Sequence, residues 1–308
     1  MSRHLLDIAQ LERRTLDYLL DRGEYWLDPA HAEVGRTRLI GRGVALLFYE
    51  NSTRTRCSFE LAARRLGADV LNLDIEHSAV EKGESIVDTG TTLAAMGISH
   101  FVIRHGSEGV PAELASALPS GSSVLNAGEA HVAHPTQALL DALTLRRSFG
   151  QLEGLRIAII GDIRHSRVAA SAISIFRRLG VGEIRLAGPR PLLPDNTPEG
   201  TQMSDRRDEA LAEVDVVMAL RIQRERMART TTPDPEDYRE HWGLEEADLA
   251  RLAPEARLMH PGPVNRGVEI SDELADGPRS LIREQVRNGV AMRMAVLEWL
   301  DEENRNGQ

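Results

Sequence analysis

Cysteine is almost absent from the sequence, and positive charge is in deficit. Cys57 is the only cysteine among 308 residues, which excludes an intrachain disulfide and a cysteine-based zinc cluster and favours a reducing, cytoplasmic location. We expect this residue to pack within a helix as a small apolar side chain. Lysine and arginine number 37 against 47 aspartates and glutamates, a net charge of −10. This balance disfavours a general surface for nucleic acid, so any phosphate site must be local.

Long apolar runs are also missing near the start of the chain. The stretch MSRHLLDIAQLERRTLDYLL scatters charges among its apolar positions, unlike a signal peptide or a membrane span. We therefore expect a cytoplasmic protein that does not associate with membranes. A length of 308 residues favours two domains of about 150 residues each.

Short apolar segments bounded by turn residues recur along the chain and alternate with helical patterns. The expected strands are Val44–Tyr49, Val70–Leu73, Phe101–Ile103 and Val124–Leu125, then Ile157–Ile160, Glu183–Leu186, Val214–Leu220 and Arg257–Met259. The expected helices include Leu11–Arg22, Phe59–Leu66, Ile86–Met96, Arg167–Leu179, Asp205–Ala212 and Glu245–Leu252. This rhythm predicts the α/β class, with two domains that each hold a largely parallel sheet flanked by helices.

The predicted break between the domains lies near Pro135. A proline at the first helical position gives up only an orphan backbone donor, so Pro135 is expected to begin an interdomain helix that runs to Arg147. The last helix, about Leu281 to Glu302, carries an apolar stripe that could pack back on the first domain. The expected domains are residues 1–133 with the C-terminal helix 291–308, and residues 134–290.

The strongest chemical signal is Ser52-Thr53-Arg54-Thr55, which lies between a predicted strand and a predicted helix. A hydroxyl-rich helix N-terminus after a strand offers backbone N–H groups and the positive end of the helix dipole to an anion. Arg54 adds a guanidinium that can hold two phosphate oxygens. The pattern predicts a phosphate site. The alternative is that Ser52 or Thr53 only caps the helix while the arginine is solvated.

The ordinary nucleotide-binding motifs do not explain this phosphate signal. The turn has neither the spacing G-x-x-x-x-G-K-[ST] nor the spacing G-x-G-x-x-G. Gly161 follows another predicted strand, but it lacks the two further glycines of a dinucleotide site. Arg167 begins the next predicted helix, on the side of an α/β sheet where ligands bind.

Several segments occur together in the order and spacing of one enzyme family, namely Ser52–Arg56, Ser78–Glu84, Arg104-His105, His134–Gln137, Asp162–Arg167, Arg221–Gln223 and His260–Pro263. From about Ile40 to Leu300 the sequence resembles the aspartate/ornithine carbamoyltransferase family. Arg221-x-Gln223 and His260-Pro261-Gly262-Pro263 resemble the motifs of the branch that uses aspartate. Ornithine-type enzymes carry His-Cys-Leu-Pro in place of His260-Pro261-Gly262-Pro263. A dicarboxylate acceptor also calls for more than one cationic or amide partner.

The resemblance implies a set of residues that bind carbamoyl phosphate. In that set Arg104, His134 and Thr55 would surround the carbonyl oxygen and stabilise its developing charge, and Gln137 would face the carbamoyl NH₂ group. Taken alone, His134 could instead be a helix N-cap with no chemical part. The whole set is Ser52, Thr53, Arg54, Thr55, Arg104, His134 and Gln137, with backbone contacts from Gly262 and Pro263.

The resemblance also implies an aspartate site formed by Lys82, Arg167, Arg221 and Gln223. In the family, the loop that carries the equivalents of Ser78 and Lys82 reaches into the active site of a neighbouring subunit. Ala79 and Glu81 depart mildly from the family pattern there, and by composition the loop could be a solvated connection. The implied catalytic residues are Arg54, Thr55, Lys82, Arg104 and His134.

The activity implied is transfer of a carbamoyl group from carbamoyl phosphate to the α-amine of L-aspartate, in pyrimidine (UMP) synthesis. No cofactor or metal is expected, since His131, Asp162 and His165 form no recognisable ligand set. The expected assembly is a homotrimer with a shared active site, free or within a larger complex with regulatory or dihydroorotase-like chains. Two alternatives are a carbamoyltransferase for another acceptor, such as ornithine, and an inactive scaffold subunit.

Overall fold

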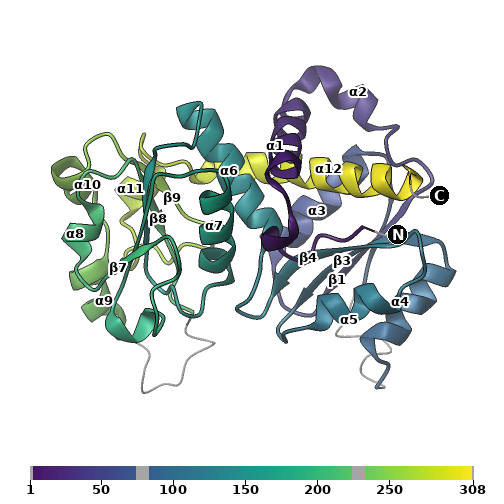
Figure 1. The fold of residues 1–308 in the computed structure, drawn as a ribbon, viewed down its shortest axis with the longest axis horizontal. Coiled ribbons are helices and arrows are strands. Elements are labelled where there is room, and N and C mark those ends of the chain that lie inside the picture. Colours follow the sequence, from purple (N-terminus) through teal and green to yellow (C-terminus); the bar gives the residue numbers. More distant parts are fainter. Residues whose placement is uncertain (1–2, 74–82, 224–232, 307–308) are drawn as a thin grey trace. The chain divides into compact units, whose positions relative to one another are not determined.

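The chain forms two compact units, each built around a parallel sheet with helices on both faces (Figure 1). The computed structural model describes residues 3–73, 83–223 and 233–306. Unit 1 comprises Met1–Leu143 with Arg287–Gln308, and unit 2 comprises Thr144–Val286. The α/β class with two parallel sheets is confirmed. The division falls within the helix that begins at Pro135, whereas we predicted it just before that residue.

The sheet of unit 1 has four strands in the order β2-β1-β3-β4, and every neighbouring pair is parallel. Val44 to Leu47 on the central strand β1 are fully buried, as expected for a strand covered on both faces. The strands are β1 (Gly43–Phe48), β2 (Asp69–Asn72), β3 (Ile98–His105) and β4 (Ser123–Glu129).

Helices cover both faces of this first sheet. Leu93 of α4 and Leu114 of α5 pack with β1, β3 and β4 in one buried apolar cluster, and Figure 1 shows α3 and α12 on the other face. The helices of unit 1 are α1 (Arg13–Leu27), α2 (Ala32–Gly35), α3 (Thr53–Arg65), α4 (Ile86–Ala95), α5 (Val110–Ala117) and the greater part of α6 (Pro135–Phe149) and α12 (Ile282–Asn306).

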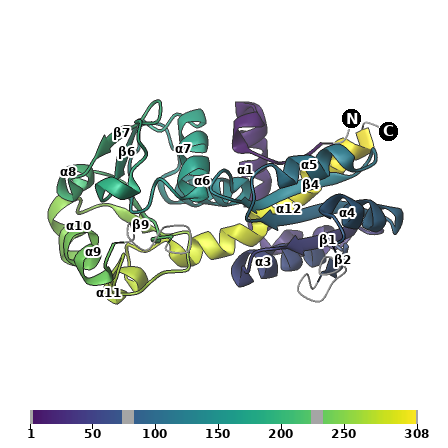
Figure 2. The same ribbon diagram turned by 90° about the horizontal axis from the view of Figure 1, so that it is seen from below.

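Glu298 ties α12 to the N-terminal part of unit 1. Its nearly buried carboxylate accepts a two-pronged bond from Arg22 at 2.8–3.0 Å and a bond from Trp26 Nε1 at 3.0 Å. Arg38 Nε lies 3.2 Å from the same carboxylate. Figures 1 and 2 show α12 passing beside α3 and crossing α1. Because a buried carboxylate is costly unless it is paired, this cluster fixes where α12 lies on α1.

The sheet of unit 2 has five strands in the order β7-β6-β5-β8-β9, again all parallel. Buried residues of α8, α9, α10 and α11 pack in one cluster on one face, and α7 lies on the other face (Figure 1). The strands are β5 (Arg156–Ile160), β6 (Glu183–Ala187), β7 (Gln202–Ser204), β8 (Val216–Ala219) and β9 (Arg257–Met259). The helices are α7 (Arg167–Arg178), α8 (Arg207–Leu211), α9 (Pro235–Trp242), α10 (Glu246–Leu252) and α11 (Asp272–Asp276).

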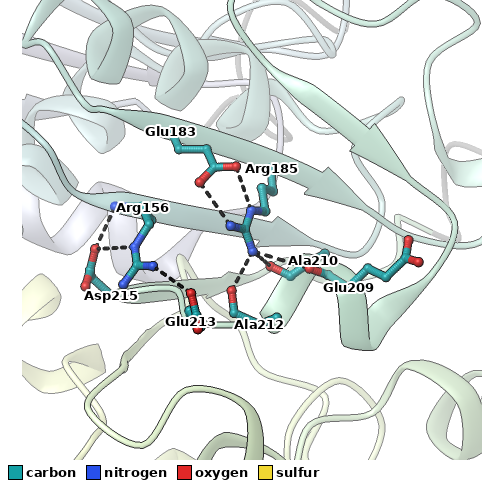
Figure 3. A network of polar contacts seen from close by, with 8 residues as sticks. All are labelled: Arg156, Glu183, Arg185, Glu209, Ala210, Ala212, Glu213 and Asp215. Atoms are coloured by element: carbon teal, nitrogen blue, oxygen red, sulfur yellow. Dashed lines mark hydrogen bonds and ion pairs between the residues drawn. The ribbon is translucent and has the colours of Figure 1, made fainter.

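A polar network lies where the strands of this second sheet begin (Figure 3). Arg185 pairs with Glu183 through two bonds of 2.9 and 3.0 Å, and its Nη1 donates to the Ala212 carbonyl at 2.6 Å, just after α8. Asp215 accepts a bond from the Arg156 backbone N–H at 2.8 Å. These contacts satisfy strand and helix ends at the edge opposite the candidate site described below, so their role is structural.

Most expected elements are present, with five omissions and one error. The sequence did not predict α2, α5, β7, α9 or α11. The prediction that Cys57 packs as an apolar side chain is wrong, because the residue is exposed on α3. Within the part of the chain that the structure describes, no helix is both long and apolar enough to cross a membrane.

Candidate active site

The strand order of unit 1 creates a switch point between β1 and β3. From β1 the chain passes outward to β2, and β3 then lies on the other side of β1. In parallel α/β sheets, ligands bind beyond the carboxyl ends of the strands at such a point. The Ser52–Thr55 turn follows β1, and Arg104 near the end of β3 is in register with Phe48. The fold therefore brings these predicted groups to the same edge of the sheet.

The helix α3 begins at this turn with Ser52 as its N-cap. The Arg56 N–H donates to the Ser52 carbonyl at 3.0 Å, so the amides of the turn before it point out of the helix end. Among the described residues, the Ser52 side chain makes no capping hydrogen bond to the helix. The alternative that Ser52 serves only as a side-chain cap is therefore not supported.

The side chains of the turn combine positive charge with partial shielding. Thr53 and Arg54 are exposed, whereas Thr55 is buried. Desolvation by nearby protein atoms lowers the pKa of Arg54, but an arginine remains cationic at neutral pH. No acidic residue occurs in the first turn of α3. The guanidinium and the positive end of the helix dipole thus act together on any anion at this turn.

Arg104 is held at the same edge by contacts on both sides. Its Nε lies 3.3 Å from Glu50 Oε2, and only 14% of its side chain is exposed. Its Nη1 donates to the Ala127 carbonyl at 3.4 Å. The Tyr49 N–H donates to the Arg104 carbonyl at 2.9 Å, which joins the ends of β1 and β3. A shielded guanidinium that is fixed in this way can polarise a carbonyl oxygen without first reorganising.

The start of α6 adds two further predicted residues in unit 1. The helix begins at Pro135, as predicted, and the buried His134 precedes it. The His134 carbonyl accepts bonds from the Gln137 and Ala138 N–H groups at 3.0 and 3.2 Å. The Gln137 side chain is buried and its Nε2 donates to Asp141 Oδ1 at 3.0 Å. His134 and Gln137 are thus presented by one helix N-terminus.

Unit 2 has its own switch point, between β5 and β8. From β5 the chain winds outward through β6 and β7 and then returns to β8 and β9 on the other side. Arg167 opens α7 after β5, with Ser166 as a side-chain N-cap that accepts from Ala169 N–H at 3.2 Å. Arg221 and Gln223 follow β8. The three predicted aspartate residues therefore occur beyond the carboxyl ends of two adjacent strands.

Asp162 organises this second half-site, and the sequence did not assign it a role there. It is fully buried. Its Oδ2 accepts from the Gln223 N–H at 3.0 Å, and its Oδ1 accepts from His165 N–H and Nδ1 at 3.1 and 2.8 Å. Arg221 Nη2 in turn donates to Gln223 Oε1 at 3.1 Å. Asp162 thereby links the loop after β5 to the loop after β8.

Gly161 makes this approach of the two loops possible. Its φ is +127°, and a Cβ there would lie 2.6 Å from the Leu220 carbonyl oxygen. Any other residue would push β8 away from β5 at the strand ends. The glycine therefore serves close backbone packing beside Asp162.

The segment His260–Pro263 follows β9, the edge strand next to β8. The His260 N–H donates to Gln285 Oε1 at 3.0 Å, and the Gly262 N–H donates to His260 Nδ1 at 2.8 Å. The peptide bond between Gly262 and Pro263 is cis. Glu269 Oε2 lies 4.0 Å from His260 Nε2. Burial of the Glu269 carboxyl group raises its pKa.

Ser78 and Lys82 lie outside the described residues, so the loop that carries them stays a prediction. No group of three or more histidines, cysteines, aspartates or glutamates is placed to hold a metal ion in residues 3–73, 83–223 and 233–306. Arg54, Thr55 and Arg104 gather at the edge of one sheet, and Arg167, Arg221 and Gln223 at the edge of the other. The chain thus carries two cationic half-sites, one in each unit.

Sequence profiles and relatives agree on one family. Residues 3–147 match the profile described as aspartate/ornithine carbamoyltransferase, carbamoyl-P binding domain, and residues 153–300 match its Asp/Orn binding domain. A protein of Stenotrophomonas maltophilia named aspartate carbamoyltransferase catalytic subunit is 51% identical over 97% of this chain and 96% of its own length. A protein of the same name from Xanthomonas euvesicatoria is 50% identical, with the same coverage.

Solved structures agree as well. Aspartate transcarbamoylase from Trypanosoma cruzi, in complex with N-(phosphonacetyl)-L-aspartic acid, is 29% identical with a TM-score of 0.85 and covers 96% of this chain and 94% of its own. The catalytic subunit of M. jannaschii aspartate transcarbamoylase is 29% identical with a TM-score of 0.84 and covers 98% and 99%. Two profiles that together span nearly the whole chain, and relatives at half identity, lead to one conclusion: the chain belongs to the aspartate/ornithine carbamoyltransferase family.

Proposed function

We propose that this chain is the catalytic chain of an aspartate carbamoyltransferase, which forms N-carbamoyl-L-aspartate and phosphate from carbamoyl phosphate and L-aspartate. The observation that carries the proposal is the pair of half-sites. The turn Ser52–Thr55 in unit 1 suits a phosphate, and Arg167, Arg221 and Gln223 in unit 2 suit a dicarboxylate. The names of the half-identical relatives agree with this assignment. The reaction belongs to pyrimidine synthesis, and we infer a cytoplasmic enzyme.

Carbamoyl phosphate binds first in this mechanism. The amides and hydroxyls of the Ser52–Thr55 turn receive its phosphate, and Arg54 neutralises the phosphate charge. Thr55, Arg104 and His134 direct donors to the carbonyl oxygen. Because Arg104 is already fixed by Glu50 and Ala127, it can stabilise negative charge on this oxygen as soon as that charge develops. The Gln137 amide meets the carbamoyl NH₂ group, and the backbone of Gly262 and Pro263 makes further contacts.

Aspartate then binds to the second half-site. Arg167 and Arg221 pair with its carboxylates, Gln223 adds an amide contact, and Lys82 offsets the negative charge that the two substrates bring together. The α-amine attacks the carbonyl carbon and forms a C–N bond. The resulting tetrahedral species expels phosphate, which accepts the proton from the amine. No residue of the chain forms a covalent bond with the substrate.

Acceptor specificity tests the proposal directly. The purified chain is assayed for ureido product with carbamoyl phosphate and either L-aspartate or L-ornithine. We expect product with aspartate and none with ornithine. Product with ornithine alone would overturn the acceptor assignment, and no product with either acceptor from a folded trimer would favour a scaffold role.

The homotrimer with a shared site has its own test. Arg54→Ala and Lys82→Ala chains should each be nearly inactive. If Lys82 serves a neighbouring subunit, every mixed trimer contains one interface where an intact Arg54 meets an intact Lys82. About three quarters of the trimers are mixed after random reassembly, so about a quarter of wild-type activity should return. Verified mixed trimers without any activity would contradict the shared site.

A further inference from the structure

The orientation of the Gln137 side-chain amide is fixed by its neighbour on α6. Gln137 Nε2 donates to Asp141 Oδ1 at 3.0 Å, and both side chains are buried. An ionised carboxylate can only accept hydrogen bonds, so the NH₂ end of the amide must face Asp141. The carbonyl end, Oε1, is then the end that faces away from Asp141. Asp141 therefore decides which end of the Gln137 amide a ligand meets.

This orientation matters for the proposed substrate. The carbamoyl NH₂ group donates hydrogen bonds, so its partner must be an acceptor. An amide turned by 180° would place NH₂ against NH₂, which leaves two buried donors without acceptors. Acetyl phosphate has a methyl group in place of the NH₂ group. Because a methyl group makes no hydrogen bond, the binding of acetyl phosphate should not depend on the orientation of the Gln137 amide. The Gln137 amide orientation thus bears on selection of the carbamoyl group, provided that the proposed function holds.

Arg293 completes this arrangement from α12. Its side chain is 3% exposed, and its guanidinium interacts electrostatically with Asp141. Its Cζ also lies over the Phe59 ring of α3, 4.9 Å from the ring centroid. Because a buried carboxylate needs a compensating charge, Arg293 supplies the positive charge that balances Asp141.

Gly289 leaves space beside its backbone for the Arg293 guanidinium. Arg293 Nη1 donates to the Gly289 carbonyl, one turn earlier on α12, at 2.9 Å. A Cβ at position 289 would lie only 2.7 Å from this Nη1 and 3.2 Å from Leu140 Cδ2 on α6. A glycine in a helix interior costs stability relative to alanine. Its presence here is explained by the guanidinium packed against it.

We propose that Asp141 and Arg293 are positioning residues for the carbamoyl end of carbamoyl phosphate, because together they hold the Gln137 amide with its carbonyl oxygen toward the substrate. Neither residue is assigned a contact with substrate. Arg293 also joins α6 to α3, the helix that carries the phosphate turn. The network therefore sets the carbamoyl subsite in relation to the phosphate subsite within unit 1.

Replacing Asp141 by asparagine tests the inference. The cation of Arg293 attracts the carbonyl oxygen of the new amide, so its NH₂ group faces Gln137 and the Gln137 amide turns over. We expect the KM for carbamoyl phosphate to rise about tenfold at saturating aspartate, since one hydrogen bond is lost and a donor is left unsatisfied. The inhibition constants of acetyl phosphate and inorganic phosphate should change less than about twofold, because the phosphate turn is intact.

Asp301→Asn is a matched control. Asp301 is also a buried carboxylate, on α12 itself, and its Oδ1 lies 2.7 Å from Arg42 Nε. It should lower thermal stability without changing the ratio between carbamoyl phosphate and acetyl phosphate. Gly289→Ala is a second test variant, because it displaces the Arg293 guanidinium while leaving Asp141 and Gln137 in place. It should show the same selective loss to a smaller degree.

Gln137→Ala separates failure of this inference from failure of the proposed function. If it leaves selection of carbamoyl over acetyl phosphate unchanged, the role of Gln137 is wrong and the inference falls with it. If it abolishes the selection, Asp141→Asn should add nothing in that background. Equal weakening of carbamoyl phosphate, acetyl phosphate and phosphate by Asp141→Asn would show a merely structural role. No effect of Asp141→Asn on any of them would also overturn the proposal.

Discussion

Replacing Asp162 by asparagine is expected to damage the use of aspartate selectively. The buried carboxylate accepts two bonds at Oδ1, both from His165, and one at Oδ2, from the Gln223 N–H. The asparagine NH₂ group must replace one of these oxygens. In place of Oδ1 it would oppose two donors, whereas in place of Oδ2 it opposes only one. The less costly choice therefore breaks the bond to Gln223.

The structure sets the size of this effect. Loss of one hydrogen bond to a buried charged acceptor costs about 1.5–3 kcal/mol. The displaced Gln223 also carries the Oε1 that accepts from Arg221 Nη2 at 3.1 Å, so the guanidinium loses its support as well. If the whole cost falls on the aspartate half-site, kcat/KM for aspartate should fall about 10- to 150-fold. The KM for carbamoyl phosphate should stay within about twofold of wild type, because the Ser52–Thr55 turn and Arg104, which are proposed to hold most of that ligand, belong to the other sheet.

Steady-state kinetics with each substrate varied in turn measures both quantities. Asp215→Asn is the control, because Asp215 accepts the Arg156 N–H at 2.8 Å at the opposite edge of the same sheet (Figure 3). It should reduce stability without a selective effect on aspartate. The role of Asp162 is refuted if Asp162→Asn leaves kcat/KM for aspartate within about twofold of wild type, or if both variants lower it equally.

Four further substitutions have expected outcomes. Arg221→Ala should raise the KM for aspartate, and Arg54→Ala should raise the KM for carbamoyl phosphate. Each should lose about 2–4 kcal/mol of transition-state stabilisation. Initial-rate kinetics that show the opposite pattern would exchange the two assignments. Glu298→Gln should lower the free energy of unfolding by about 3 kcal/mol, since it leaves buried donors facing a neutral amide. A change below about 0.5 kcal/mol in urea unfolding would contradict the role of Glu298 in holding α12 on α1. Burial raises the pKa of Glu269 above its ordinary 4.5, so the folded state binds this proton more tightly than the unfolded state. Its contribution to stability therefore falls as the pH rises from 4.5 through the raised value. Glu269→Gln should remove this pH dependence of the free energy of unfolding. Parallel profiles of stability against pH for the wild type and the variant would disprove the prediction.

The strands and the turn Ser52–Thr55 at the start of α3 could be predicted because their causes are local. The apolar run that became β1 is buried on both faces, which is typical of parallel sheets and needs no knowledge of its neighbours. The helix after it begins at Ser52, where hydroxyl and cationic residues follow the strand directly. Pro135 opens α6 for an equally local reason. The order of such elements then leads to the two switch points.

The missing elements have weak local signals. α5 begins after Gly109, which has a φ of +86°, and carries a proline in its first turn, so its start looks like a loop. β7 is a three-residue edge strand of Gln202, Met203 and Ser204, ordered by pairing with β6. Such pairing depends on a partner elsewhere in the chain, so periodicity alone does not identify the strand.

The supporting residues of the site were missed because their partners are distant in sequence. Asp162 acts on Gln223, 61 positions later, and Arg293 of α12 acts on Asp141 of α6. A charged residue in a helix reads as part of a solvated face until its burial is known. Only the spacing of Gln137 and Asp141, four residues apart on one helix face, offered a signal that could have suggested their hydrogen bond.

The exposed thiol of Cys57 gives this enzyme one natural attachment point for a spectroscopic reporter. Cys57 follows Arg54 by three positions on α3, so the two side chains share a helix face with Cβ atoms about 5–6 Å apart. A thiol-reactive fluorophore would therefore lie beside the phosphate turn, and the sequence has no second cysteine to compete for it. Occupancy of the turn by phosphate compounds can then be followed by fluorescence titration in the otherwise unaltered chain.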